Sequence, residues 1–202
     1  MKFICDSNDL KDYLIETEEI DFSHLVIKSK ALELKLKSLT EIQLVKEVFE
    51  FVRDEVSHSW DIQSNRITRK ASEVLIYKEG ICYAKSNLLA ALLRTLAIPT
   101  GFCYQRLTIG ETPDTGYCIH ALNAVYLSSL GRWVRIDARG NKLGINAQFS
   151  IGEEILAFHV RENLGEIDYP TIYFKPNIKT MKILKENTNC IEMYLKNLPT
   201  EI

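Results

Sequence analysis

The feature that most constrains the fold is an apolar segment near the middle of the chain. Residues 86–96 are rich in leucine and alanine, and Arg94, near the end, is their one charged residue. A helix that is apolar around its whole circumference has to be buried. Pro99 stops this helix because proline cannot continue an α-helix. The chain must therefore fold with other elements packed around one central helix.

The amino-terminal part of the sequence predicts three further helices. Residues 25–37 and 41–56 have helical patterns, and in the second the apolar side chains recur at intervals of three and four. Thr40 has the side chain expected of an N-cap for that second helix. Residues 71–77 predict a short helix that ends at Gly80.

Strands follow the central helix. Residues 101–108 predict one strand, and the alternating segments 117–127 and 132–138 predict a β-hairpin around the turn residues 128–131. The order of helices, then consecutive antiparallel strands, then helices is typical of an α+β protein and not of a βαβ protein.

The remaining segments carry weaker patterns. Residues 57–70 and 108–115 predict loops, residues 153–160 a helix, and residues 175–195 one or two helices. The sequence contains no repeat and no Pro/Gly/Ser linker, so we expect a single domain over residues 1–202.

Composition excludes several classes of function. A net charge of -2 gives no basic surface for nucleic acid, and no apolar run approaches the ~20 residues that cross a bilayer. The amino terminus lacks a signal-peptide core. Five cysteines, an odd number, argue against a disulfide framework and for reduced thiols. We therefore expect a cytoplasmic protein without nucleic-acid or membrane partners, and the sequence leaves its oligomeric state open.

The strongest candidate for chemistry is Cys82, which follows Gly80-Ile81 where a loop enters the central helix. The unpaired N–H groups and partial positive charge of a helix start stabilise a thiolate, and they can also hold a developing oxyanion. Gly80 lets a substrate approach the backbone closely. The alternative is that Cys82 is a small apolar side chain that fills space at a helix start.

His120 and Asp137 are the candidate base and its orienting carboxylate. His120 begins one strand of the predicted hairpin and Asp137 ends the other, so both lie away from the turn. A two-residue turn at 128–129 would place them directly opposite each other, whereas Gly131 permits a longer turn that slides the pairing by a few residues. Either register brings them close. A carboxylate bonded to one imidazole nitrogen leaves the other free to take the proton of a thiol. Each residue alone would more often be structural.

Four other polar residues are candidates for oxyanion or substrate contacts. His58, Trp60 and Gln63 lie in the loop before Cys82, and Gln105 lies on the strand after the helix. The sequence does not choose among them, and a structural role is an alternative for each.

The chain also suggests two weaker sites. A zinc ion held by Cys82, Cys103, Cys118 and His120 is conceivable, but their spacing matches no zinc motif. We therefore expect neither a metal nor a cofactor. Arg135 and Arg139 flank Asp137 and would keep it ionised, bind an anionic group or lie on the surface.

Three sequence blocks occur in order: Gly80-Ile81-Cys82 with residues 92–102, His120-Ala121 with Tyr126, and residues 133–138. Together they resemble the core of the transglutaminase-like superfamily, over residues 41–140 and with the short intervals of compact microbial members. Ala97 and Leu122 depart from the pattern, which usually has glycine and an aromatic residue there. Segments 1–40 and 141–202 would be extensions of the core.

This resemblance implies a papain-like fold, with a cysteine-bearing helix packed on an antiparallel sheet that carries the histidine and aspartate. It also implies Cys82 as nucleophile, His120 as general base and Asp137 as its orienter. The implied chemistry is attack on an amide or ester carbonyl through a thioester intermediate.

The substrate is left open, as a peptide, a protein or a small-molecule amide. A cysteine hydrolase or protease is the first hypothesis. An acyl transferase of the transglutaminase or acetyltransferase type is the second, and a non-catalytic binding protein on the same fold is the third. We also expect residues 141–202 to fold over the cleft and shape access to it.

Overall fold

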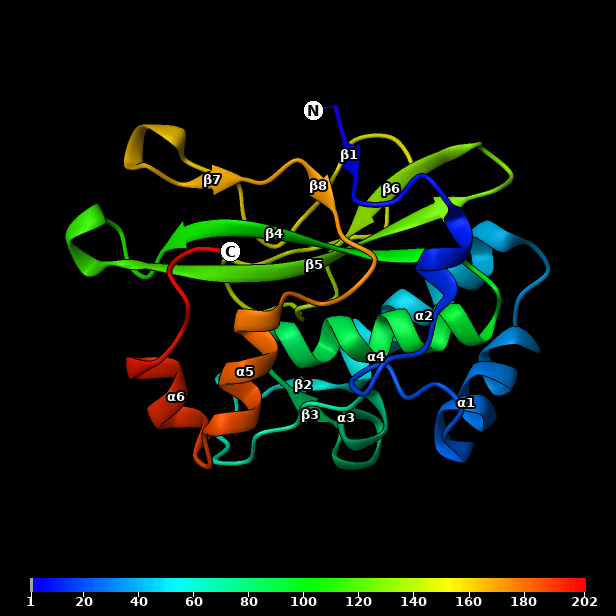
Figure 1. The fold of residues 1–202 in the computed structure, drawn as a ribbon, viewed down its shortest axis with the longest axis horizontal. Coiled ribbons are helices and arrows are strands. Elements are labelled where there is room, and N and C mark those ends of the chain that lie inside the picture. Colours follow the sequence, from blue (N-terminus) through cyan, green and yellow to red (C-terminus); the bar gives the residue numbers. More distant parts are fainter. Residues whose placement is uncertain (1) are drawn as a thin grey trace.

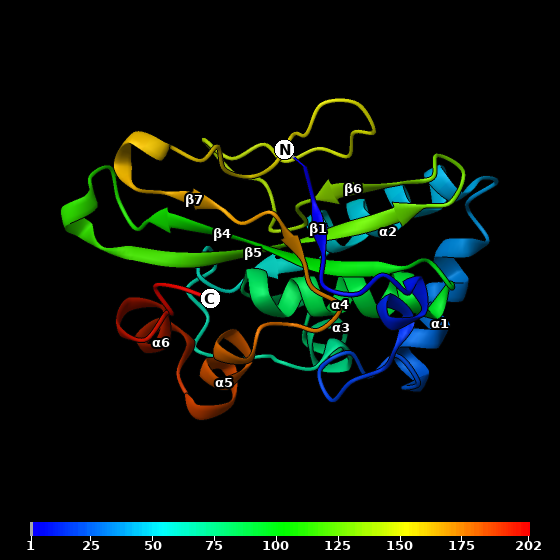
Figure 2. The same cartoon turned by 45° about the horizontal axis from the view of Figure 1, so that its top comes forward.

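The computed structural model describes residues 2–202. A curled four-stranded antiparallel sheet, in the order β6-β5-β4-β7, forms the middle layer, and the helices lie on one side of it (Figures 1 and 2). The helices are α1 Leu25–Lys35, α2 Glu41–Glu55, α3 Ala71–Tyr77, α4 Cys82–Thr95, α5 Ile178–Glu186 and α6 Cys190–Lys196. The strands are β1 Ile4–Cys5, β2 Ser57–His58, β3 Glu79–Gly80, β4 Thr100–Thr108, β5 Tyr117–Leu127, β6 Arg132–Ile136, β7 Ile167–Asp168 and β8 Thr171–Ile172. The predicted α+β class is confirmed.

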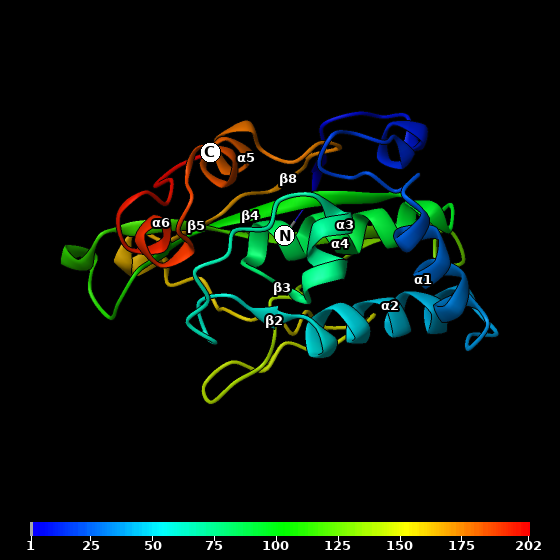
Figure 3. The ribbon, with the colours of Figure 1, turned by 90° about the horizontal axis from the view of Figure 1, so that it is seen from below.

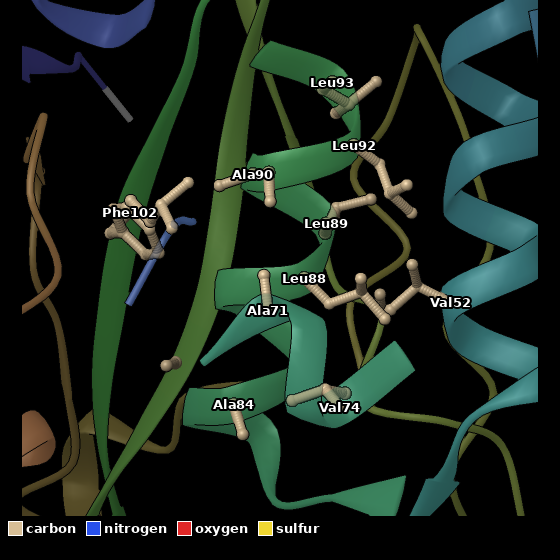
Figure 4. Packing of buried hydrophobic residues seen from close by; sticks show 14 of the residues in the cluster. Val52, Ala71, Val74, Ala84, Leu88, Leu89, Ala90, Leu92, Leu93 and Phe102 are labelled. Atoms are coloured by element: carbon tan, nitrogen blue, oxygen red, sulfur yellow. The ribbon is translucent and has the colours of Figure 1, made fainter. Parts of the chain in front are cut away.

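Helix α4 is the buried centre of the helical layer, as predicted. It contacts α1, α2 and α3 on one side and strands β4 and β5 on the other (Figure 3). Figure 4 shows leucine side chains of α4 extending toward α2, where Leu88 meets Val52, while Phe102 packs from β4. Burying each such side chain contributes about 1.5–3 kcal/mol to the free energy of unfolding. The packing of this layer therefore holds α4, and with it the residue at its start, in a fixed position.

The carboxyl end of α4 is closed by a Schellman motif. The Ile98 N–H donates to Leu93 O and the Ala97 N–H donates to Arg94 O, each at 3.0 Å. Ala97 has a φ of 59°, in the left-handed region that favours glycine. Alanine thus replaces the glycine of the family pattern at a position where the backbone of a non-glycine residue is strained.

The β5–β6 hairpin has the longer of the two turns that the sequence allowed. Leu127 pairs with Arg132, which leaves residues 128–131 as the turn, and Gly131 has a φ of 62°. The pairing of β5 with β6 ends at Asn123 and Ile136. Strand β5 continues to Tyr117, so its first half has an edge that β6 does not cover.

Most predicted elements are present, with local differences. The N-cap role of Thr40 and the two carboxyl-terminal helices are confirmed. Helix α3 ends at Lys78 in a left-handed conformation, and Gly80 instead belongs to β3, which pairs with β2 inside the predicted 57–70 loop.

The predicted helix at 153–160 is wrong. This segment is irregular, because its backbone bonds outside the segment: Gln148 N donates to Ile155 O, and Ala157 N donates to the side chain of Asp137. Hydrogen bonds to residues outside the segment thus override a local apolar pattern that resembles a helix. Among residues 2–202, no helix is long and apolar enough to cross a membrane.

Candidate active site

Cys82 is the first residue of α4. The helical hydrogen bonds begin with Lys85 N donating to Ile81 O, so the N–H groups of the first turn have no acceptor within the helix. Gly80 precedes the helix in β3, where an added Cβ would lie 3.0 Å from both Ala84 Cβ and Thr68 Oγ1. Glycine therefore permits the tight approach that places Cys82 at the helix start.

His120 and Asp137 come together at the place where the hairpin stops pairing. Continuing the register beyond Ile136 would place Asp137 opposite Leu122, two residues from His120. Residues two apart on a strand share a face, so both side chains point the same way. His120 Nε2 lies 2.8 Å from Asp137 Oδ2. The predicted proximity is confirmed, although the two residues are not directly opposite each other.

The carboxylate of Asp137 is fully buried and receives three hydrogen bonds. Besides His120, the backbone N–H of Arg139 donates to Oδ1 at 3.1 Å and that of Ala157 donates to Oδ2 at 3.0 Å. Burial favours the neutral acid, but the charge of His120 and these hydrogen bonds outweigh it and lower the pKa of Asp137. The group is therefore held as an anion.

The imidazole of His120 has the opposite shift. Burial would lower its pKa, but the charge of Asp137 and the hydrogen bond to it raise the pKa to about 10. Cys82 adds to this rise as a hydrogen-bond partner and as a nearby negative charge. Because Nε2 is bonded to Asp137, Nδ1 is the ring nitrogen left for the thiol. The arrangement can hold a thiolate–imidazolium pair.

Cys82 and His120 open into a cleft of about 580 Å³. One wall comes from β4, β5 and the loop between them, and another from the irregular segment that includes Phe158. The third wall consists of Trp60, in the loop after β2, and the carboxyl-terminal residues Tyr194 and Leu198. A volume of this size is within the range of sites that bind small molecules.

The four secondary candidates occupy different places. Trp60 lines the cleft and stacks on Tyr194, and His58 also lines the cleft. Gln63 is exposed and donates to Trp60 O at 2.6 Å, outside the cleft. Gln105 pairs with His120 across the β4–β5 ladder, but it is buried and is not part of the cleft lining.

His58 differs from His120, although both line the cleft. Burial, followed by the charge of Arg139, lowers its pKa well below the usual value, so it is neutral. Its Nδ1 is buried and has no hydrogen-bond partner among residues 2–202. A neutral imidazole with an unused nitrogen can contact a polar group of a substrate.

The two arginines around Asp137 do not pair with its carboxylate. Arg135 binds Glu154 and Asp168, whereas the guanidinium of Arg139 binds Asp61 at 2.5 Å. Only the backbone of Arg139 contacts Asp137. The interpretation that these side chains keep Asp137 ionised is therefore wrong, because each already has a carboxylate partner.

The sequence missed the residues that shape the cleft. Phe158 packs edge-on against the His120 ring, with centroids 4.9 Å apart, and Tyr194 stacks on Trp60. Neither belongs to a motif or has a spacing that would reveal it. Within residues 2–202, no group of three or more His, Cys, Asp or Glu side chains is arranged so that it could hold a metal ion, and all five cysteines are free thiols.

A helix that begins with a cysteine, set against an antiparallel sheet that carries a bonded His–Asp pair, defines the papain-like class of fold and site. A family model described as the transglutaminase-like superfamily matches residues 28–138, more than half of the 202-residue chain. The chain belongs to this superfamily, whose members are typically cysteine-dependent acyl-transfer or protease-like enzymes.

Solved structures resemble this chain at low sequence identity. A candidate cysteine protease from Cytophaga hutchinsonii has a TM-score of 0.53 and 19% identity, over 66% of this chain and 43% of that one. The periplasmic domain of TgpA from Pseudomonas aeruginosa has a TM-score of 0.48 and 16% identity, over 65% and 48%. The chain thus spans less than half of either protein. No curated protein matches it by sequence.

Proposed function

We propose that this protein is a cysteine-dependent enzyme that transfers acyl groups from amides or esters through a thioester on Cys82. The observation that carries the proposal is the His120–Asp137 bond of 2.8 Å beside a thiol at a helix start, in one cleft. Each component has a structural explanation alone, but their conjunction is the arrangement that activates a thiol.

The reaction would proceed in two halves. The Cys82 thiolate attacks the carbonyl carbon and forms a C–S bond, and the charge moves to the carbonyl oxygen. The tetrahedral intermediate collapses as the protonated His120 gives its proton to the leaving amine or alcohol. His120 then takes a proton from water or an acceptor amine, which attacks the thioester and releases Cys82.

The oxyanion would be held by N–H donors of residues that line the cleft. The backbone N–H of Cys82 is free of intrahelical acceptors, and the indole N–H of Trp60 is a second donor in the lining. Of the secondary candidates, Trp60 and the neutral His58 remain in our proposal. Gln63 and Gln105 leave it because neither lines the cleft.

Hydrolysis is our first choice of reaction, on a peptide, protein or small-molecule amide. Transfer to an amine, of the transglutaminase or acetyltransferase type, is the alternative, and the chemistry differs only in the acceptor of the second half. We also keep the proposal of a cytoplasmic location, which the five free thiols favour. A binding protein without turnover is the remaining alternative.

An activated ester tests the proposal without a known substrate. We expect p-nitrophenyl acetate to leave an acetyl group on Cys82, located by peptide mass spectrometry. His120→Ala should slow acylation by about 10²–10⁴-fold. Cys118→Ala is the matched control, since Cys118 lines the same cleft and burial raises its pKa to about 12. Acylation that is indifferent to His120, or that needs Cys118 and not Cys82, would refute the proposal. Added methylamine distinguishes an amide product from an acid.

A further inference from the structure

The carboxyl-terminal residues 190–202 lie outside the part of the chain that the family model matches. Helix α6 is nevertheless fixed to the site region. Its Cys190 N–H donates to Asn65 O at 2.9 Å, and Met193 is fully buried in the main core. Beyond α6 the chain turns back and ends beside β5 (Figures 1 and 2). This segment is therefore anchored next to the cleft at both of its ends.

The tail covers the edge of β5 that β6 leaves open. Ile119, which precedes His120, donates its N–H to Pro199 O at 2.9 Å. Its carbonyl accepts a hydrogen bond from Tyr83 Oη at 2.7 Å. Both backbone groups beside the candidate base are thus satisfied from within the chain. An extended polypeptide that tried to add to this edge would have to displace the tail.

The side chains of the same segment narrow the cleft. Tyr194 stacks on Trp60 with ring centroids 4.3 Å apart and planes 12° apart. Leu198 also lines the cleft, together with Tyr194 and Cys82. These two stacked rings give the cleft a broad aromatic surface on this side.

We infer that residues 190–202 form a selectivity wall, which admits a slender acyl group to Cys82 and excludes an extended peptide main chain that would pair with β5. The inference rests on the proposed function, because it takes Cys82 as the reacting atom. The acyl donor would then be an amide or ester at the end of a narrow chain, and an internal peptide bond would be a poor substrate.

Two thiol reagents of different shape test this wall. Iodoacetamide is slender, whereas a tripeptide chloromethyl ketone presents extended main chain on one side of the reacting carbon. Labelling of Cys82 is followed by peptide mass spectrometry at about pH 9, where a thiol without activation also reacts. We expect Leu198→Ala, and a chain ending at Asn197, to raise the ketone-to-iodoacetamide rate ratio at least about tenfold, a barrier change of about 1.4 kcal/mol.

Leu195→Ala is the matched control, because this α6 side chain is 63% exposed and is not part of the cleft lining. The control should leave the ratio unchanged. The inference is overturned if Leu198→Ala leaves the ratio unchanged, or if Leu195→Ala raises it equally. If the chain ending at Asn197 does not fold, the Leu198→Ala variant alone still tests the inference. Failure of the proposed function would show separately, as labelling that does not depend on His120 near neutral pH.

Discussion

His120 and Asp137 are joined by a 2.8 Å hydrogen bond although the hairpin register sets them two positions apart. The four-residue turn creates this offset, and the end of the β6 ladder at Ile136 lets Asp137 reach back toward the imidazole. The offset also frees the Asp137 carboxylate to accept the N–H groups of Arg139 and Ala157. The site thus depends on where the strand stops as much as on which residues it carries.

Replacing Asp137 by Asn should lower both stability and thiol reactivity. An amide has one acceptor oxygen, so its NH₂ group would face a donor at Arg139, Ala157 or His120. We expect a loss of about 1–3 kcal/mol in the free energy of unfolding, measured by urea denaturation. Asp168→Asn, which changes a carboxylate bonded to Arg135, is the control and should leave Cys82 reactivity unchanged. A stable Asp137→Asn variant with normal reactivity would contradict the assigned role.

The raised pKa of His120 predicts a loss of stability in alkali. The group binds its proton more tightly in the folded protein, with a pKa of about 10 against an ordinary value of 6.5. Its contribution is therefore fully present below about pH 6.5 and is lost as the pH rises toward 10. The free energy of unfolding of the wild type should fall over this range relative to His120→Gln. Parallel curves for the two proteins would contradict the prediction.

Ala97→Gly should stabilise the protein. Ala97 has a φ of 59° at the end of α4, and a non-glycine residue there costs about 1–2 kcal/mol. Part of this gain is offset because glycine loses more conformational entropy on folding, which leaves about 0.5–1 kcal/mol. Ala91→Gly, within the same helix, should instead destabilise by about 1 kcal/mol or more. A shift of the thermal unfolding midpoint in the same direction for both variants would contradict this account.

Gly101→Ala should destabilise the sheet where β4 meets β8. An added Cβ would lie 2.5 Å from Ile172 Cγ2 and 3.0 Å from the backbone oxygen of Tyr173, so the backbone would have to move. We expect a cost of about 1–3 kcal/mol, measured by urea denaturation. Gly152→Ala should have little effect, because the atom nearest to a Cβ added there is Ser150 Oγ at 3.9 Å. Equal effects of the two changes would be inconsistent with this packing.

The sequence predicted the parts of the fold that local patterns specify. The apolar residues of α4, the hairpin alternation and the position of Cys82 at a helix start are local, and each is found. The register of the hairpin depends on the length of its turn. The sequence did not determine this length, because Gly131 permits a turn longer than two residues. The irregular segment at 153–160 could not be predicted, because its conformation depends on hydrogen bonds to Asp137 and Gln148.

The walls of the cleft were hidden for the same reason. Tyr194 stacks on Trp60, although all four strands of the main sheet lie between them in the sequence. No sequence spacing predicts such a contact. The expectation that residues 141–202 shape the cleft did not name Tyr194 or Leu198, which line it. The structure supplies these residues through long-range packing.

The central claim is tested most directly by the pH dependence of Cys82 alkylation with iodoacetamide. The account predicts rapid labelling at about pH 6, where an ordinary thiol is protonated, and a strong loss of that labelling in His120→Ala. Cys82→Ala identifies the labelled residue. Labelling that rises only near about pH 8.5, whatever residue stands at position 120, would contradict the account and favour a binding protein on the same fold.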